Sequence, residues 1–160
     1  MAEELTNQKL CKIELDETSI GRGTQDQEHE RAVAIYDLIE ANEFSLVSGE
    51  SGPFILRLAL QDARLVMEIR AKDASLLVSH HLSLTPFRGV LKDYFAICDR
   101  YFSAIRTATP AQIEVLDMGR RAVHNQGAEI LKDRLEGKLI FDFNTARRLF
   151  TLVTALHWRG

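Results

Sequence analysis

The stretch FILRLALQDARLVMEIRAKDASLLVSHHLSL, residues 54–84, decides the fold. Apolar residues alternate with other residues in three short runs that begin near Phe54, Leu65 and Leu76. Alternation with a period of two is typical of a strand that buries one face. Only short polar segments, QDAR and KDA, separate the runs. The three strands are therefore expected to pair antiparallel as a meander with one solvated face.

The segments before this meander predict a strand, a helix and a further short strand. Residues 10–15 alternate apolar and polar side chains and favour a short, half-buried strand. Thr24 and Gln27 have the spacing of a capping box, which predicts a helix that runs to about Ala41. Residues 44–47 predict the second strand, which is short.

Helical patterns fill the chain after the meander. Three helices are expected, over residues 85–107, over residues 109–136, and from a cap at Asp142 or Asn144 to about His157. Thr85 followed by proline is expected to cap the first helix, and Thr109 begins the second in another capping box. The sequence thus predicts an α+β fold: a short N-terminal strand and helix, an antiparallel strand meander, and then three helices packed on one face.

Composition indicates one globular domain. The chain has 160 residues, of which 46% are apolar and 27% charged, as in ordinary folded domains of this length. No apolar run is long enough to span a membrane, and the acidic N-terminus lacks the apolar region of a secretory signal. We expect a cytoplasmic protein without membrane association, with residues 1–9 as a flexible terminus and residues 10–160 as a single α+β domain.

Charge is distributed unevenly along the chain. Residues 1–50 contain four bases against twelve acids, a net charge of −8, whereas residues 51–160 contain sixteen bases against eleven acids, a net charge of +5. The two halves could neutralise each other within one fold or across a dimer, or the basic half could meet an anionic ligand or partner. Nucleic-acid binding is not expected, because no basic run is interleaved with aromatic residues and the pI is about 6.0.

The expected helix over residues 109–136 carries the leading candidate site. Arg120 lies four positions before His124, so the two share a helix face, and Arg121 and Asn125 are their neighbours. Together these four residues could bind a phosphate or carboxylate, although a solvated or interface helix face is the alternative interpretation. Arg120 is expected to lower the pKa of His124.

Residues elsewhere could complete this site. His81 or Arg57 from the sheet could contribute to it. Gly119 and Gly127 lie inside the same helix, where glycine costs stability, and indicate a close approach by another backbone or by a ligand.

The candidate interface lies in the C-terminal region and consists of Trp158, Arg159, Arg147 and Arg148. Trp158 and Arg159 could dock into a partner subunit or close over a pocket, or Trp158 could pack on its own core. Arg147 and Arg148 could pair with acidic residues of the first helix, which would explain the uneven charge without a ligand.

Metal and cofactor motifs are missing from the sequence. Cys11 and Cys98 lie far apart and are expected to be reduced and packed. His80 falls on the apolar phase of its strand and His81 on the polar phase, and no H-x-x-x-H or C-x-x-C pattern occurs. Phosphate-binding glycine loops and nucleophile motifs are also missing, so we expect no metal, no cofactor and no catalytic residue.

Five segments are distinctive as a set: LSLTPFR (82–88), IRTATP (105–110), DMGRR (117–121), TARRLFTL (145–152) and LHWRG (156–160). Together they resemble a small bacterial family that is catalogued only as uncharacterised. The resemblance implies a bacterial cytosolic setting and a single domain. It implies no activity and assigns no catalytic residue.

Two functional hypotheses follow from the sequence. The first is a cytosolic, non-enzymatic regulatory or scaffolding protein that acts through a protein interface. The partner at this interface is an unknown protein or a second copy of the chain in a homodimer. Apolar residues beyond one stripe on the first and last helices favour it. The second is a small enzyme or binder of a small anionic ligand, a phosphate or a carboxylate, at the Arg120–His124 helix face.

Overall fold

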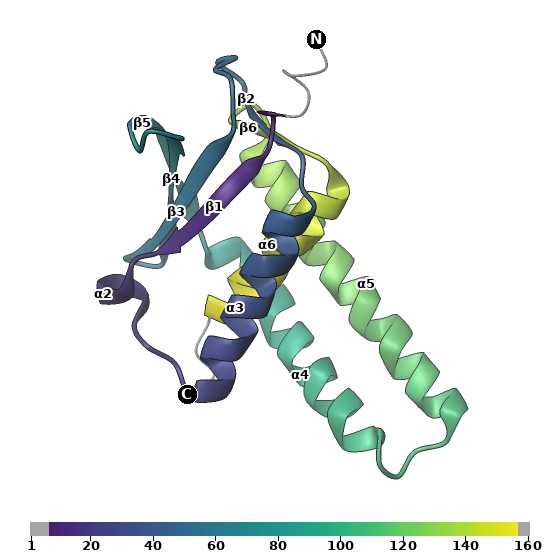
Figure 1. Ribbon diagram of the computed structural model, residues 1–160. Coiled ribbons are helices and arrows are strands. Elements are labelled where there is room, and N and C mark those ends of the chain that lie inside the picture. The colour runs from purple at the N-terminus through teal and green to yellow at the C-terminus, as the bar shows by residue number, and fades with distance from the viewer. Residues whose placement is uncertain (1–6, 157–160) are drawn as a thin grey trace.

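The computed structural model describes residues 7–156, which form two sheets and a layer of helices (Figure 1). The elements are β1 (Leu10–Leu15), α2 (Glu17–Ile20), α3 (Gln25–Glu40), β2 (Phe44–Leu46), β3 (Phe54–Gln61), β4 (Arg64–Ala71), β5 (Leu76–Ser83), the 3-10 turn η1 (Thr85–Phe87), α4 (Arg88–Ala104), α5 (Pro110–Leu135), β6 (Leu139–Phe141) and α6 (Phe143–Leu156). This order confirms the α+β class, with a strand meander followed by helices.

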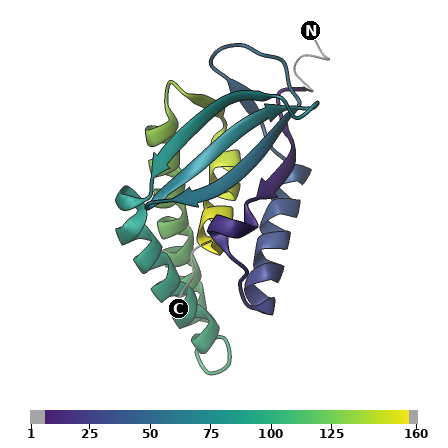
Figure 2. The same cartoon turned by 90° about the vertical axis from the view of Figure 1, so that its left-hand side faces the viewer.

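The larger sheet has the strand order β1-β3-β4-β5. β3, β4 and β5 pair antiparallel, which confirms the meander, and β1 joins β3 in parallel. Figure 2 shows that the helices lie behind one face of this sheet and leave its other face open. The side chains of the sheet that are buried in the core are Leu10, Ile13, Phe54, Ile55, Leu56, Leu58, Leu65, Met67, Ile69 and Leu82.

A bulge in β1 changes the side-chain pattern that the sequence predicts. The register with β3 shifts between Leu10 and Lys12, which leaves Cys11 as an extra residue. Leu10 and Ile13 are both buried as a result, and Cys11 is exposed. The expectation that Cys11 packs in the core is therefore wrong, whereas Cys98 on α4 is buried as expected.

α6 lies at the centre of the helical layer, in contact with both α3 and α5 (Figure 1). Asp142 caps it, because its Oδ1 accepts a hydrogen bond from the Thr145 backbone N–H at 3.0 Å. Most of α6 is buried, which explains its apolar residues without an interface. On α3, by contrast, Val33 and Tyr36 remain 44% and 65% exposed.

Sequence patterns missed or misplaced several local features. β6 was not predicted, and it pairs antiparallel with β2 to form the small sheet. The short helix α2 was also missed. Thr85 does not cap a helix. It is the first residue of the 3-10 turn that precedes α4, and no side-chain hydrogen bond caps this turn. The capping boxes at Thr24 and Thr109 are both present as expected.

The ion pairs that the sequence suggested as an explanation of the uneven charge do not form within residues 7–156. Within residues 7–156, neither Arg147 nor Arg148 forms an ion pair with an acidic residue of α3. Arg31 makes a different connection between the two helices: its buried side chain donates from Nε to the Ala155 carbonyl at 3.0 Å. A guanidinium there is favourable, because the carbonyl groups at a helix C-terminus carry partial negative charge.

Some expectations concern residues that the structure does not describe. Trp158 and Arg159 lie outside the described range, as do residues 1–6. Contacts with the core begin before β1, because the Gln8 carbonyl accepts from the Phe44 N–H at 3.0 Å. Among residues 7–156, no helix is both long and apolar enough to cross a membrane.

Candidate functional site

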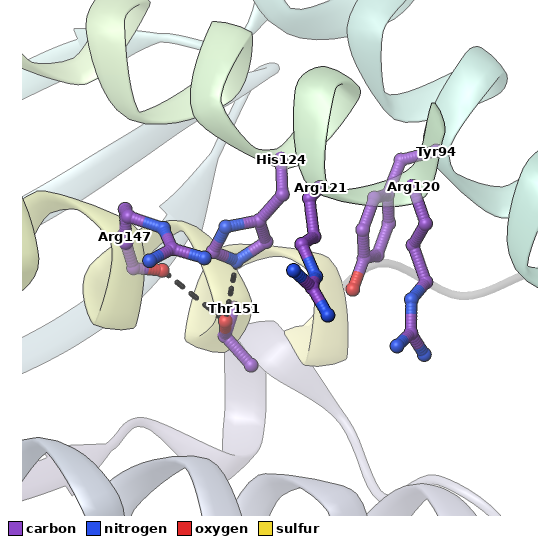
Figure 3. Close-up of a pocket in the computed structure, with 6 residues that line it drawn as sticks. All are labelled: Tyr94, Arg120, Arg121, His124, Arg147 and Thr151. Carbon is purple, nitrogen blue, oxygen red and sulfur yellow. Dashed lines mark hydrogen bonds between the residues drawn. The ribbon is translucent and has the colours of Figure 1, made fainter. Parts of the chain in front are cut away.

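A pocket of about 310 Å³ opens where α4, α5 and α6 meet (Figure 3). Its lining consists of six side chains: Tyr94, Arg120, Arg121, His124, Arg147 and Thr151. α4 contributes the tyrosine, α5 the next three residues and α6 the last two. Helical spacing of four residues places Arg120 beside His124 and Arg147 beside Thr151, so one face of each helix supplies the site.

Gly127 allows α5 and α6 to approach closely beneath this pocket. A Cβ atom at this position would lie 2.2 Å from Cε1 of Phe150, so only glycine leaves room for the ring. The Phe150 ring meets the His124 ring edge-on, with the centroids 5.4 Å apart, and the Tyr94 ring lies 5.7 Å from His124. Gly127 thus accommodates an aromatic side chain, which corrects the expectation of an approaching backbone or ligand.

Gly119 has a similar but weaker role on the other side of α5. A Cβ atom there would lie 2.6 Å from Cδ1 of Ile97 on α4. This neighbour is the flexible end of an aliphatic side chain and can move. The two glycines therefore set the spacing of α5 from α4 and from α6, and the second of these contacts is the rigid one.

His124 forms a hydrogen-bonded relay with α6. Its Nε2 lies 2.8 Å from Oγ1 of Thr151, and that hydroxyl donates to the Arg147 carbonyl at 3.1 Å. Because the hydroxyl has one proton, His124 must donate from Nε2, and this fixes the neutral tautomer. Nδ1 is then a buried acceptor with no hydrogen-bond partner in the described structure.

Burial, together with the smaller effects of the charges of Arg147 and Arg120, lowers the pKa of His124 to about 4. The expectation that Arg120 depresses this pKa is confirmed, although burial and Arg147 have larger effects. His124 is therefore neutral at pH 7. Its ring positions Thr151 and packs against Phe150 without adding charge to the pocket.

The arginines of the pocket have too few acidic partners. Arg120 and Arg121 share one carboxylate, Asp117, at 2.5 Å and 2.6 Å. The Arg120 guanidinium also lies 4.3 Å from the centroid of the Tyr101 ring. Arg147 has no acidic partner within residues 7–156, and its buried Nε lacks a hydrogen-bond acceptor there. Among residues 7–156, three positive charges therefore meet one negative charge at the pocket.

The orientation of the side chains favours a ligand with oxygen acceptors. Figure 3 shows the guanidinium groups of Arg120 and Arg121 and the Tyr94 hydroxyl extending toward the same open space, with Thr151 at its edge. Guanidinium and phenol groups donate hydrogen bonds to oxygen, and a guanidinium fits carboxylate and phosphate in a bidentate way. The pocket can hold a small anion.

The structure unites part of the predicted site and separates the rest. Arg120, Arg121 and His124 share the pocket as predicted, but Asn125 is not among its lining residues. Arg57 and His81 are not among them either, because both belong to the sheet and not to α4, α5 or α6.

Sequence reasoning missed two residues of the pocket and misassigned a third. Tyr94 and Thr151 were not singled out, and Arg147 was assigned to an interface with Arg148, which does not line the pocket. The spacing of Arg147 and Thr151, four residues apart, was a signal that they share one helix face.

Metal ligands do not cluster in the described structure. Within residues 7–156, no group of three or more histidine, cysteine, aspartate and glutamate side chains could hold a metal ion. His80 is half-buried, and burial followed by the charge of Lys138 lowers its pKa. His81 is exposed, in agreement with its place on the polar phase of the strand.

Comparison with known proteins identifies close relatives without an assigned activity. A family model described as "Uncharacterised protein family (UPF0262)" matches residues 7–159. A UPF0262 protein of Rhizobium etli (strain CIAT 652) is 57% identical over 95% of this chain and 96% of its own length. A UPF0262 protein of Rhizobium meliloti (strain 1021) is 58% identical over 96% of this chain and 97% of its own length. A UPF0262 protein of Nitrobacter winogradskyi is 54% identical over 99% of this chain and 95% of its own length. No solved structure matches the chain significantly.

Proposed function

The chain belongs to the uncharacterised protein family UPF0262, and we propose that it binds a small anionic ligand, with a phosphate or carboxylate group, in the pocket between α4, α5 and α6. One observation carries this proposal. Arg147 lines the pocket with a buried, unpaired Nε and without an acidic partner in the described structure. A buried cationic donor without a partner is costly, and a bound anion would remove that cost.

The pocket residues have distinct roles in this proposal. Arg147 and Arg121 supply charge and directed donors, and the Tyr94 ring forms part of the pocket wall beside His124. Arg120 contributes less, because Asp117 and Tyr101 already engage its guanidinium. A volume of about 310 Å³ lies at the low end of ligand sites, so the ligand is small.

We propose binding without turnover, because the histidine is poorly suited to acid–base catalysis. A general acid or base works best when its pKa lies near the working pH. The pKa of His124 is about 4, and its Nε2 proton is already donated to Thr151. His124 is then a positioning residue that orients Thr151 and supports the aromatic wall.

Thermal unfolding with inorganic phosphate, sulfate and citrate tests this proposal, with sodium chloride at matched ionic strength as the reference. A ligand at about 100 times its Kd adds roughly 2.7 kcal/mol, which raises Tm by several degrees for a domain of this size. We expect Arg147→Met to abolish the shift. Arg57→Met, which removes an arginine from the open face of the sheet, is the matched control and should keep it.

Two results would refute the anion-binding proposal. One is an equal Tm shift in wild type and in Arg147→Met, which would place the bound anion elsewhere. The other is no shift with any of the three anions beyond that of sodium chloride. A difference between phosphate and citrate would separate phosphate from carboxylate recognition.

The second candidate function is a cytoplasmic regulatory or scaffolding protein that works as a homodimer. The observation that favours it is an edge of the large sheet, strand β5, which within residues 7–156 has a neighbouring strand on one side only. Light scattering on the purified protein tests it, because a homodimer has twice the 18.1 kDa mass of the chain. A monomer at every concentration would contradict it.

A further inference from the structure

The two edges of the large sheet differ in how they are protected. β1 forms one edge and β5 the other. Exposed edge strands carry unpaired backbone groups that can pair with another chain, and natural proteins protect them with charges, prolines, bulges or covering elements. The comparison of β1 with β5 shows which edge is open to a partner.

β1 has several of these protections. The Asn42 side chain accepts from the Leu10 N–H at 2.7 Å and donates to the Leu10 carbonyl at 3.1 Å. Helix α3 packs beside the strand, and Lys12 and Glu14 add charges. The bulge at Cys11 interrupts its regular pairing as well. A further strand cannot pair with β1 without displacing these groups.

β5 has almost none of them. Its eight residues, LLVSHHLS, include no aspartate, glutamate, lysine, arginine or proline. Within residues 7–156 it is paired with β4 alone. A register shift opposite Ile69 and Arg70 affects only its first residues and leaves Val78–Ser83 regular. A long, uncharged and uncovered edge of this kind is prone to pair with another strand.

The hydrogen bonds to β4 show which groups of β5 point outward. The Leu84 N–H donates to the Ala63 carbonyl at 2.9 Å, in the same register that pairs β5 with β4. Hydrogen-bonded pairs in an antiparallel ladder recur at every second residue. Ser79, His81 and Ser83 therefore turn their N–H and C=O groups away from β4, and their side chains are all exposed.

We propose that β5 pairs antiparallel with β5 of a second copy of this chain, so that the two sheets become continuous across a two-fold axis. An antiparallel pair of identical strands is self-complementary, as an isologous dimer interface must be. The strand has no charged side chain, so two copies meet without like-charge repulsion along the seam. This inference does not rest on the anion site, and it gives the proposed homodimer its surface.

One register uses all three outward-facing residues. With His81 at the two-fold axis, Ser79 of one copy lies opposite Ser83 of the other, and each outward N–H meets a carbonyl. On the inner face, His80 lies opposite Leu82 of the second copy. Nε2 of His80 is buried and has no partner in the described structure.

Sedimentation equilibrium on the full-length protein tests the proposal, with His81→Pro as the main variant. Wild type should sediment at twice the 18.1 kDa chain mass at high concentration and dissociate on dilution. Proline removes the outward N–H of His81 without removing a hydrogen bond to β4. We expect His81→Pro to be monomeric where wild type is dimeric, with an unchanged circular dichroism spectrum.

Two further variants make the test decisive. His81→Ala keeps the backbone N–H and should remain dimeric, since the pairing is between backbones. His81→Lys places two positive charges opposite each other at the axis and should raise the dimer Kd at least tenfold, which matters if the proline variant does not fold. The Tm shift with sulfate should persist in every folded variant, because the anion pocket is separate.

Three results would overturn the edge pairing. A wild type that stays monomeric at every concentration would remove the dimer altogether. A dimer that survives both His81→Pro and His81→Lys would show that copies associate through another surface. A dimer that His81→Ala dissociates would show that the histidine side chain, and not the backbone ladder, holds it together.

Discussion

Two arginine clusters in this molecule contrast in how their charge is balanced. On the open face of the sheet, Arg57 lies 3.1 Å from Asp16, 3.8 Å from Glu68 and 3.9 Å from Glu14. Arg70 joins this sheet cluster through Glu68 at 2.9 Å. In the pocket cluster, Arg120 and Arg121 share the carboxylate of Asp117, and Arg147 has no acidic partner within residues 7–156.

The contrast separates a structural role from a binding role. The sheet cluster satisfies its own arginines and needs no ligand. The pocket cluster leaves a buried guanidinium nitrogen without an acceptor in the described structure, in a concave site. An unbalanced charge in a pocket is typical of functional sites, where local stability is reduced to favour binding.

The largest effect should come from a substitution at Gly127, where α5 packs against the Phe150 ring behind the pocket cluster. In Gly127→Ala, the new Cβ would collide with the Phe150 ring and displace the wall behind His124. Overpacking of this kind typically costs about 1–3 kcal/mol. We expect a lower free energy of unfolding in urea titrations and a weaker Tm shift with sulfate.

Gly119→Ala is the matched control for that variant. The same change on the same helix meets only the flexible end of Ile97, and alanine favours helix by up to about 1 kcal/mol over glycine. Its stability should equal or exceed that of wild type, with sulfate binding retained. Equal losses in both variants would mean that Gly127 has no special role.

The next largest expected effect is a loss of stability at acidic pH that arises from His124 in the pocket. The pKa of His124 is about 4 in the folded protein and 6.5 when unperturbed, so between these values the unfolded chain binds a proton that the native state does not. The neutral His124 ring therefore contributes its full share to the free energy of unfolding above pH 6.5, and this share is lost as the pH falls toward 4. For a half-buried ring we expect a loss of about 1–2 kcal/mol.

Urea titrations of wild type and His124→Gln between pH 4 and 7 measure that loss. Glutamine does not titrate, so the variant should show a shallower decline of stability with acidification. Parallel curves for the two proteins would show that His124 titrates alike in the folded and unfolded states, and would contradict the burial of its ring.

The smallest expected effect is a difference in the free energy of unfolding between variants of the two arginine clusters. Arg57→Met removes the cation that joins three carboxylates and should lower the free energy of unfolding by about 0.5–1 kcal/mol. Arg147→Met removes an unpaired guanidinium and should leave stability unchanged or slightly higher. Thermal unfolding without added anions checks both, and a clear loss of stability in Arg147→Met would contradict the assignment.

Patterns that depend on local periodicity were readable from the sequence. Alternation identified the meander, and the capping boxes at Thr24 and Thr109 located the starts of two helices. Helical spacing also brought Arg120 and His124 together. These features follow from the chemistry of neighbouring residues, so no knowledge of tertiary contacts was needed.

Features that depend on tertiary contacts were not readable. The bulge at Cys11 is visible only in the register with β3. The three-residue strand β6 is defined by its pairing with β2, far away in the sequence. Arg147 and Arg121 belong to one pocket because α5 and α6 pack together at Gly127, and no local pattern gives that distance.

The most direct test of the central claim measures the pKa of His124 by NMR, with and without sulfate, at constant ionic strength. Sulfate keeps its charge over the whole titration, and a bound anion would offset the effect of Arg147 and Arg120 on the ring. We expect a pKa of about 4 without sulfate and a higher value, by about half a unit or more, at saturation. An identical pKa in both conditions would contradict anion binding in this pocket.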